Sequence, residues 1–153
     1  MAEFKYQLEN LASVRGEVDS LFYKHWEEIA INKDKIKLNP DWSFYETADT
    51  AGLLGIYTIR ESGNLVGYFF VLARPNPHYK DHVFAVNDLL FIDPDYRKGL
   101  AGLKLIKFAE EDLKSRGVSV LVINTKVHKP FDALLERLGF ENVERSYSKF
   151  IGE

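Results

Sequence analysis

Apolar residues recur at helical spacing in two long segments of the chain and in two short ones. Between Ala12 and Ile31 the apolar side chains fall three or four positions apart, which predicts an amphipathic helix with one buried face. Gly117 would end the second long helix as its C-terminal cap, and Gly139 would end the last short one. The four predicted helices are Ala12 to Ile31, a short helix beginning near Asp41, Gly102 to Arg116, and Pro130 to Leu138.

Short apolar runs rich in β-branched and aromatic residues predict the strands. Glu61-Ser62-Gly63-Asn64 separates two such runs and is a strong hairpin signal, whereas Arg74 to Asp81, with two prolines, is predicted to be a loop. The run that starts at Val118 is almost continuously apolar, as expected for a strand buried on both faces. The predicted strands are Phe4 to Leu8, Leu53 to Arg60, Leu65 to Leu72, Val83 to Ile92, Val118 to Asn124, and one or two within Phe140 to Ile151.

Composition favours one compact domain over residues 1–153 and excludes several classes of protein. With 46% hydrophobic residues among 153, the chain can bury a full core, and no linker, repeat or low-complexity segment interrupts it. It has no cysteine, which excludes disulfides and a cysteine nucleophile. A net charge of −3 argues against nucleic-acid binding, and no run of about eighteen apolar residues could span a membrane. We therefore expect a cytoplasmic protein.

The candidate chemistry lies where the strand ending at Ile92 leads into the helix from Gly102. The loop between them contains Gly99, preceded by Arg97 and Lys98. The first turn of a helix offers unpaired N–H groups and the positive end of the peptide dipoles, so an anionic oxygen there gains several donors. Neither GxxxxGK(S/T) nor GxGxxG, the common nucleotide-binding motifs, is present. The loop therefore predicts a phosphate site of another kind, unless its glycines serve only the turn.

Two landmarks indicate a family. Tyr96-Arg97-Lys98-Gly99-Leu100-Ala101-Gly102 resembles the acetyl-coenzyme A loop of the GCN5-related N-acetyltransferase (GNAT) superfamily, and Ala133 to Phe140 is similar to its A-x-x-LYEKLGF segment. The resemblance covers roughly Leu53 to Phe150. It implies the α/β GNAT fold, a mixed and mostly antiparallel sheet with splayed central strands and helices on both faces. It also implies acetyl-CoA as cosubstrate, and the compact loop looks most like that of bacterial or phage-encoded members.

The resemblance implies a set of coenzyme-binding residues. In the family the pantetheine arm inserts between two central strands, here the predicted strands ending at Ile92 and Asn124, and pairs with backbone groups near Leu90 and Ile92. A backbone N–H close to Leu90 would polarise the thioester carbonyl. The residues expected to contact the coenzyme are Leu90, Phe91, Ile92, Arg97, Lys98, Gly99, Leu100, Ala101, Gly102, Leu103, Asn124 and His128.

The candidate catalytic groups come from the same comparison. The amine must attack as a free base, and Asp88 occupies the strand position where many members carry a glutamate, so it is the first candidate for the proton acceptor. The alternative is a capped or salt-bridged surface acid. Leu135 replaces the tyrosine that commonly protonates the leaving thiolate. His128 and Tyr147 are the candidates for that acid in its place, and the thiolate can also leave without one.

The acceptor end of the cleft is expected to be aromatic. Trp26, Trp42 and Tyr45 are the candidate substrate-binding residues, although core packing is the favoured explanation for Trp26 and an open alternative for Trp42 and Tyr45. His78 and His82 have the spacing of a metal pair on a helix, but the loop predicted around them argues against a helix. We expect no metal site.

The sequence is compatible with three functions from different classes. The first is an N-acetyltransferase that acts on a primary amine of a small molecule. The second acts instead on a protein or peptide amine, and the third is a regulatory module that holds acetyl-CoA with little chemistry, as the missing tyrosine suggests. A homodimer is compatible with all three, and the acceptor itself cannot be read from the sequence.

Overall fold

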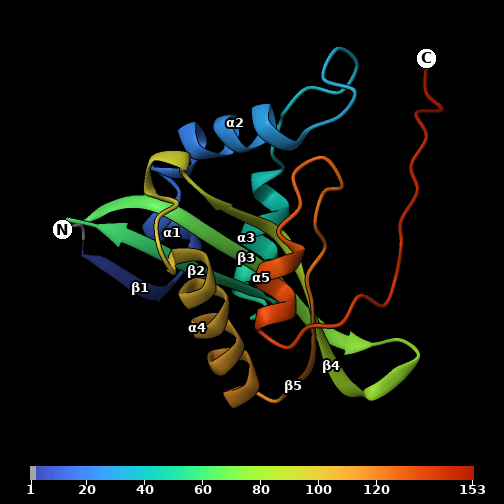
Figure 1. The fold of residues 1–153 in the computed structure, drawn as a ribbon. Coiled ribbons are helices and arrows are strands. Elements are labelled where there is room, and N and C mark those ends of the chain that lie inside the picture. The colour runs from blue at the N-terminus through green and yellow to red at the C-terminus, as the bar shows by residue number, and fades with distance from the viewer. Residues whose placement is uncertain (1–2) are drawn as a thin grey trace.

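A mixed five-stranded sheet forms the centre of the computed structural model, which describes residues 3–153 (Figure 1). The strand order is β1-β2-β3-β4-β5, and all neighbours are antiparallel except the parallel pair β4 and β5. This arrangement confirms the predicted fold class. The strands are β1 Phe4–Glu9, β2 Leu54–Glu61, β3 Asn64–Asn76, β4 Tyr79–Ile92 and β5 Val118–Val122.

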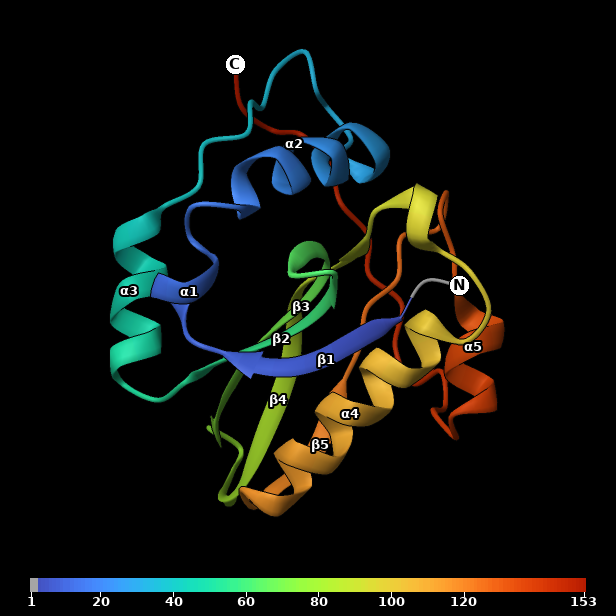
Figure 2. The ribbon, with the colours of Figure 1, turned by 90° about the vertical axis from the view of Figure 1, so that its left-hand side faces the viewer.

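Helices cover both faces of the sheet (Figure 2). On one face lie α1 Leu11–Val14, α2 Val18–Ile29 and α3 Trp42–Thr50; on the other lie α4 Ala101–Ser115 and α5 Asp132–Arg137. A short 3-10 helix, η1 Pro94–Tyr96, joins β4 to α4. Side chains of a strand alternate between faces, so Tyr68 and Phe70 enter the core beneath α2, whereas Phe69 and Val71 enter the core beneath α4.

The prediction of one continuous helix from Ala12 to Ile31 is wrong, because the chain breaks between α1 and α2. Glu17 lies at the break, where its carboxylate binds the Arg60 guanidinium at 3.0 Å and accepts a hydrogen bond from the Leu65 N–H at 3.3 Å. Both partners belong to the β2–β3 hairpin. These contacts fasten the hairpin to the start of α2.

The segment predicted as a loop, Arg74 to Asp81, instead extends the hairpin of β3 and β4. β3 continues to Asn76 and β4 begins at Tyr79, with these two residues paired. The register shifts next to Pro75, and a bulge tolerates a residue that has no N–H to donate. Pro75 therefore lies within β3 at a bulge, and Pro77 lies in the two-residue turn between β3 and β4.

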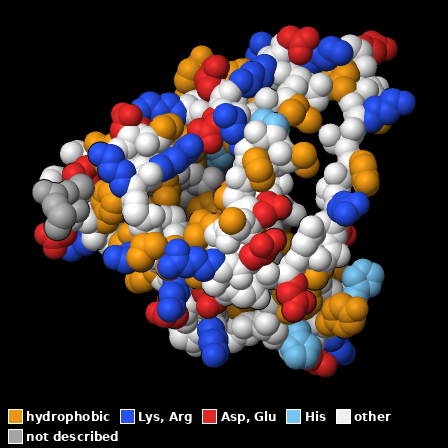
Figure 3. All heavy atoms as spheres, in the orientation of Figure 1, with side chains coloured by type: hydrophobic (Ala, Val, Ile, Leu, Met, Phe, Trp, Pro, Cys, Tyr) orange, Lys and Arg blue, Asp and Glu red, His pale blue; other side chains and the backbone are white. Residues whose placement is uncertain are grey.

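The strands predicted within Phe140 to Ile151 are also absent. Among the described residues no strand or helix follows α5. The last residues run away from the sheet in Figure 1 and form an arm at the right of the space-filling view in Figure 3. Charged and polar residues separate the apolar ones here, so the segment has no continuous apolar face to pack. Val143 and Tyr147 are 82% and 90% exposed, while the Phe150 ring lies 4.7 Å from the Lys35 ammonium.

Candidate active site

The parallel strands β4 and β5 are paired along only part of their length. The register ends at Val86↔Val122, where β5 itself ends, whereas β4 continues to Ile92. From Asn87 onward, one edge of β4 has no neighbouring strand within residues 3–153. An open strand edge presents N–H and C=O groups with which an extended ligand can pair.

A side-chain bridge marks the point at which the two strands separate. The Asn87 Oδ1 accepts a hydrogen bond from the Asn124 backbone N–H at 2.8 Å, and the Asn87 Nδ2 donates to the Asn124 carbonyl oxygen at 3.2 Å. The side-chain amide thus occupies the place of the next backbone pair in the ladder. Asn124 lies at the base of the open edge, and its contact with the coenzyme stays a prediction.

Hydrogen bonds at the end of β4 show which residues face the open edge. The Asp93 N–H donates to the Val66 carbonyl oxygen on β3 at 2.8 Å. Because backbone groups of successive strand residues point to opposite sides, those of Ile92 and Leu90 face away from β3. The Arg97 Nε donates to the Ile92 carbonyl oxygen at 2.6 Å, which agrees with this orientation. Leu90 and Ile92, the two residues predicted to pair with the pantetheine arm, thus turn their backbone groups to the open edge, where the Arg97 side chain already binds the Ile92 carbonyl oxygen.

The loop before α4 leaves backbone donors unpaired at the start of that helix. Gly99 has a φ of 58°, a left-handed conformation that glycine adopts without strain. Within residues 3–153, the N–H groups of Gly102 and Leu103 have no hydrogen-bond partner, and Leu100 caps the helix without a side-chain hydrogen bond. A Cβ at Gly102 would lie 3.3 Å from the Leu134 Cδ2, so this glycine also lets α5 pack closely. These donors support the predicted anion site.

The two basic side chains of the loop differ in their surroundings. The Arg97 guanidinium binds the Glu28 carboxylate of α2 at 2.7 Å and lies 5.2 Å from the Phe91 ring. Lys98 is exposed and has no ion pair within the part of the chain that the structure describes. Arg97 therefore ties the loop to α2, and Lys98 is the basic side chain available to a phosphate.

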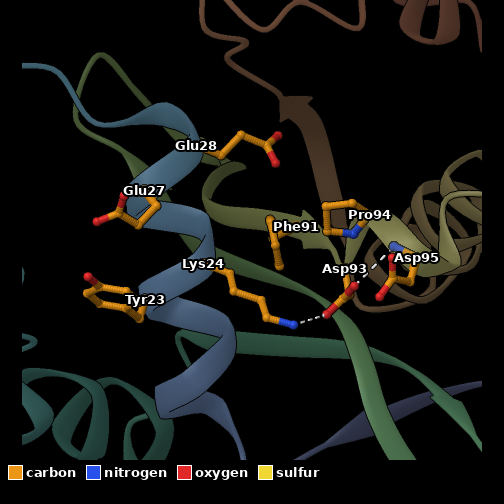
Figure 4. A pocket seen from close by; sticks show the side chains of 8 residues that line it. All are labelled: Tyr23, Lys24, Glu27, Glu28, Phe91, Asp93, Pro94 and Asp95. Carbon is orange, nitrogen blue, oxygen red and sulfur yellow. Dashed lines mark hydrogen bonds and ion pairs between the residues drawn. The ribbon is translucent and has the colours of Figure 1, made fainter.

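A pocket lies between α2 and the end of β4 (Figure 4). Its volume is about 420 Å³. Lys24 extends across it, with its Nζ 2.6 Å from the Asp93 Oδ2. Asp93 also accepts a hydrogen bond from the Asp95 N–H at 3.0 Å. No local pattern in the sequence predicts the Lys24–Asp93 pair, because 69 residues separate its members. It gives α2 a second attachment to the loop.

Asp88 lies at a β-bulge next to the point of separation. Leu89 and Asn87 face consecutive residues of β3, which leaves Asp88 between them without a partner there. Its Oδ2 accepts a hydrogen bond from the Tyr45 hydroxyl at 2.6 Å. Although the side chain reaches solvent, the protein atoms around the carboxyl raise the pKa of Asp88 above its usual value, and the Tyr45 hydrogen bond acts in the opposite direction. A carboxylate with a raised pKa is a better proton acceptor.

A buried polar pair lies beneath the same face of the sheet. The Tyr68 hydroxyl and the His25 Nδ1 are 3.0 Å apart, and both side chains are buried. Burial lowers the pKa of His25 to about 4, so its ring is neutral at pH 7. The ring stacks on Phe91 at 4.9 Å. The Phe91 side chain thus points to the α2 face, and its predicted coenzyme contact would have to involve its backbone.

Neither candidate for the general acid touches Asp88. His128 is exposed in the loop between β5 and α5, and Tyr147 lies in the extended segment after α5. No hydrogen bond joins either of them to Asp88 within residues 3–153. Leu135, at the position of the usual tyrosine, is buried in the core beneath α4. The acid roles of His128 and Tyr147 stay predictions.

The three candidate substrate-binding residues have different surroundings. Trp42 stacks on Phe22 at 5.5 Å, and the Arg15 guanidinium lies 3.5 Å from its ring centroid. The indole of Trp42 is therefore already in contact with two side chains of the protein. Trp26 is half-buried on α2. Of the three, only Tyr45 hydrogen-bonds the candidate base.

The part of the chain that the structure describes has neither a membrane-spanning helix nor a cluster of metal ligands. No helix there is long and apolar enough to cross a membrane. No group of three or more histidine, cysteine, aspartate or glutamate side chains within residues 3–153 could hold a metal ion.

Comparison with known proteins defines the class of the molecule. The model of the acetyltransferase (GNAT) family matches residues 18–140. The chain belongs to this family, and its activity is that of an acetyl-CoA-dependent N-acetyltransferase. A search among curated proteins finds no match.

Solved structures with the same fold cover nearly the whole chain. The ribosomal-protein-alanine N-acetyltransferase from Brucella melitensis biovar Abortus 2308 is 22% identical, with a TM-score of 0.73 over 98% of this chain and 100% of that one. Glucosamine-6-phosphate N-acetyltransferase from Arabidopsis thaliana is 17% identical, with a TM-score of 0.72 over 98% and 99%. A predicted acetyltransferase from Clostridium acetobutylicum, solved with acetyl-CoA, is 11% identical, with a TM-score of 0.72 over 97% of both chains.

Proposed function

We propose that the chain acetylates a primary amine of a small molecule by direct transfer from acetyl-CoA, with Asp88 as the proton acceptor. The observation that carries this proposal is the position of Asp88, at a bulge directly beside the point where β4 and β5 separate. The open edge at Leu90 and Ile92 would hold the pantetheine arm. The unpaired N–H groups at the start of α4 would bind the pyrophosphate.

The proposed reaction is a single displacement at the thioester. The lone pair of the amine nitrogen attacks the carbonyl carbon, and the proton from the nitrogen passes to the Asp88 carboxylate, directly or through a water. The backbone N–H of Leu90, on the open edge, would polarise the carbonyl oxygen. A C–N bond forms and the C–S bond breaks, so coenzyme A leaves as the thiolate. Leu135, which replaces the usual acid tyrosine, is buried in the core and cannot give a proton. The proposed route needs no dedicated acid, because a thiolate can leave without one.

A protein amine is the second candidate acceptor. The Brucella structure is that of an enzyme named for an alanine of a ribosomal protein, and it aligns over 98% of this chain. Peptides with an N-terminal alanine therefore belong beside amino sugars in any panel of acceptors. The third reading, a regulatory module with little chemistry, predicts coenzyme binding without turnover of any of them.

Release of coenzyme A measured with a thiol-reactive dye tests the proposal, because the protein has no cysteine to react. We expect turnover with at least one amine of the panel. Asp88→Asn should lower kcat about a hundredfold and leave the affinity for acetyl-CoA unchanged, since the coenzyme contacts remain. Asp81→Asn, an exposed carboxylate on the same strand, is the matched control and should behave as the wild type. An Asp88→Asn variant with full activity would place the base elsewhere.

A further inference from the structure

One side chain of α3 reaches across to the bulge of β4. The Tyr45 hydroxyl donates to the Asp88 Oδ2 at 2.6 Å, although the two residues are 43 positions apart. Within residues 3–153, Oδ1 of the same carboxyl accepts no hydrogen bond, and no cation forms an ion pair with it. Tyr45 is therefore the group that fixes this carboxyl in place.

Aromatic packing holds the Tyr45 ring in one position. Its ring lies edge-to-face against Phe70 at 5.9 Å and against Phe44 at 5.4 Å, and 5.7 Å from the Trp42 ring. Aromatic pairs at these separations stabilise a defined ring orientation. The hydroxyl is thus presented to Asp88 by a rigid neighbourhood.

The ionisable groups around Asp88 come from three elements. Tyr45 faces it from α3 and Tyr68 from β3, with His25 of α2 hydrogen-bonded behind Tyr68. Burial and the nearby carboxylate raise the pKa of the Tyr45 hydroxyl well above its usual value. Tyr45 therefore stays protonated and donates to Asp88 throughout the pH range in which enzymes are assayed. His25 is neutral above pH 5 or so, since its pKa is about 4.

We propose that Tyr45 is a positioning residue for acetyl transfer: its hydroxyl orients the Asp88 carboxyl and favours its ionised form, leaving Oδ1 for the amine. This inference rests on the proposed role of Asp88 as the base. It gives Tyr45 a different task from direct substrate binding. A hydrogen bond to the charged form of an acid favours that form, so its loss makes the carboxyl harder to ionise in a site where burial already opposes the charge.

Removal of the Tyr45 hydroxyl should move the pH profile. With Tyr45→Phe, the acid limb of kcat/KM should shift to higher pH by about one unit, because more of Asp88 is protonated at a given pH. At a pH below that limb, kcat/KM should fall about tenfold, while the KM for acetyl-CoA stays unchanged. An acid limb in the same place as that of the wild type would contradict the proposal.

The chain offers two matched controls for this variant. Tyr57 donates to Asp112 at 2.7 Å on the α4 face, so Tyr57→Phe removes an equivalent hydroxyl far from Asp88. Phe44→Leu changes the packing around Tyr45 without removing a hydrogen bond. Both controls should keep the wild-type pH profile. If either shifts the acid limb as Tyr45→Phe does, the effect comes from stability or packing, and the positioning role is wrong.

A titration of the Asp88 carboxyl separates this inference from the proposed base. The carboxyl ¹³C resonance, assigned by its absence in Asp88→Asn, should titrate at higher pH in Tyr45→Phe than in the wild type. An unchanged titration would overturn the role of Tyr45 whatever the kinetics show. If the titration shifts but Asp88→Asn stays active, the hydrogen bond acts as inferred and the assignment of the base has failed.

Discussion

Two tyrosine–aspartate pairs lie on opposite faces of the sheet and share almost the same geometry. Tyr45 donates to Asp88 at 2.6 Å, and Tyr57 donates to Asp112 at 2.7 Å. Asp112 also binds the Arg116 Nε at 2.8 Å and belongs to a regular turn of α4. Asp88 has no cation beside it within residues 3–153 and lies at a bulge where two strands separate. The same contact therefore joins α4 to β2 in one place, and in the other it leaves a carboxyl oxygen of Asp88 without a hydrogen bond within residues 3–153.

The largest effect should come from neutralising each aspartate in turn. Asp88→Asn should lower kcat about a hundredfold. It should change the melting temperature little, because the Asp88 side chain reaches solvent. Asp112→Asn should lower the free energy of unfolding by about 1–3 kcal/mol and leave kcat nearly unchanged, because the lost contact joins α4 to β2. Enzyme kinetics and thermal unfolding of both variants measure the contrast. Equal losses of activity in the two variants would contradict the different roles of Asp88 and Asp112.

The start of α4 offers a way to separate coenzyme binding from chemistry. Leu100 caps the helix, is 45% exposed and makes no capping hydrogen bond. Leu100→Glu puts a carboxylate beside the unpaired N–H groups, where it should compete with the pyrophosphate and weaken acetyl-CoA binding about tenfold. Leu100→Gln, of the same shape but uncharged, should bind within about twofold of the wild type. Calorimetric titration with acetyl-CoA measures both, and equal losses would mean that the charge is irrelevant.

The bridge at the base of the open edge should have a smaller effect. Asn87→Ala removes two hydrogen bonds to the Asn124 backbone, and each is worth about 1 kcal/mol. We expect acetyl-CoA affinity to fall about fivefold, because the point of separation is no longer fixed. Asn124→Ala keeps both of those backbone groups and should lose less. A larger loss in Asn124→Ala would show that its side chain contacts the coenzyme directly, as the sequence predicts.

The smallest effects are expected at the two candidate acids. His128 and Tyr147 are both exposed, so His128→Ala and Tyr147→Phe should change kcat by less than about twofold. Steady-state assays at saturating acetyl-CoA measure this. If the kcat of either variant falls by much more than about twofold, that side chain protonates the thiolate. Departure of coenzyme A as the free thiolate would then be excluded.

The segments that carry the site were predictable because their signals are local. Helix Gly102 to Arg116 differs from α4 by one residue at each end, and the Glu61 to Asn64 turn lies where predicted. Local signals failed at Pro75 and Pro77, where a bulge and a turn tolerate prolines within a hairpin. They failed again after Phe140, because apolar residues in a sequence do not show whether a neighbouring strand is there to bury them.

Contacts between segments far apart in the sequence could not be predicted. Asp88 and Tyr45 were both named as candidates, but nothing in the sequence joined them, because the angle at which α3 crosses the sheet depends on packing. The same holds for the Arg97 side chain. Its contact with the coenzyme stays a prediction, and the sequence did not indicate its ion pair with Glu28. Residue types were therefore predictable, and their pairings were not.

A crystal structure with coenzyme A bound would show whether the coenzyme occupies the open edge of β4. We expect the pantetheine arm to lie along the open edge of β4, paired with the backbone of Leu90 and Ile92. Its pyrophosphate should lie at the N–H groups of Gly102 and Leu103, and its sulfur on the side of β4 where Asp88 and Tyr45 meet. Coenzyme bound instead in the pocket between α2 and the end of β4, with the open edge empty, would contradict this expectation.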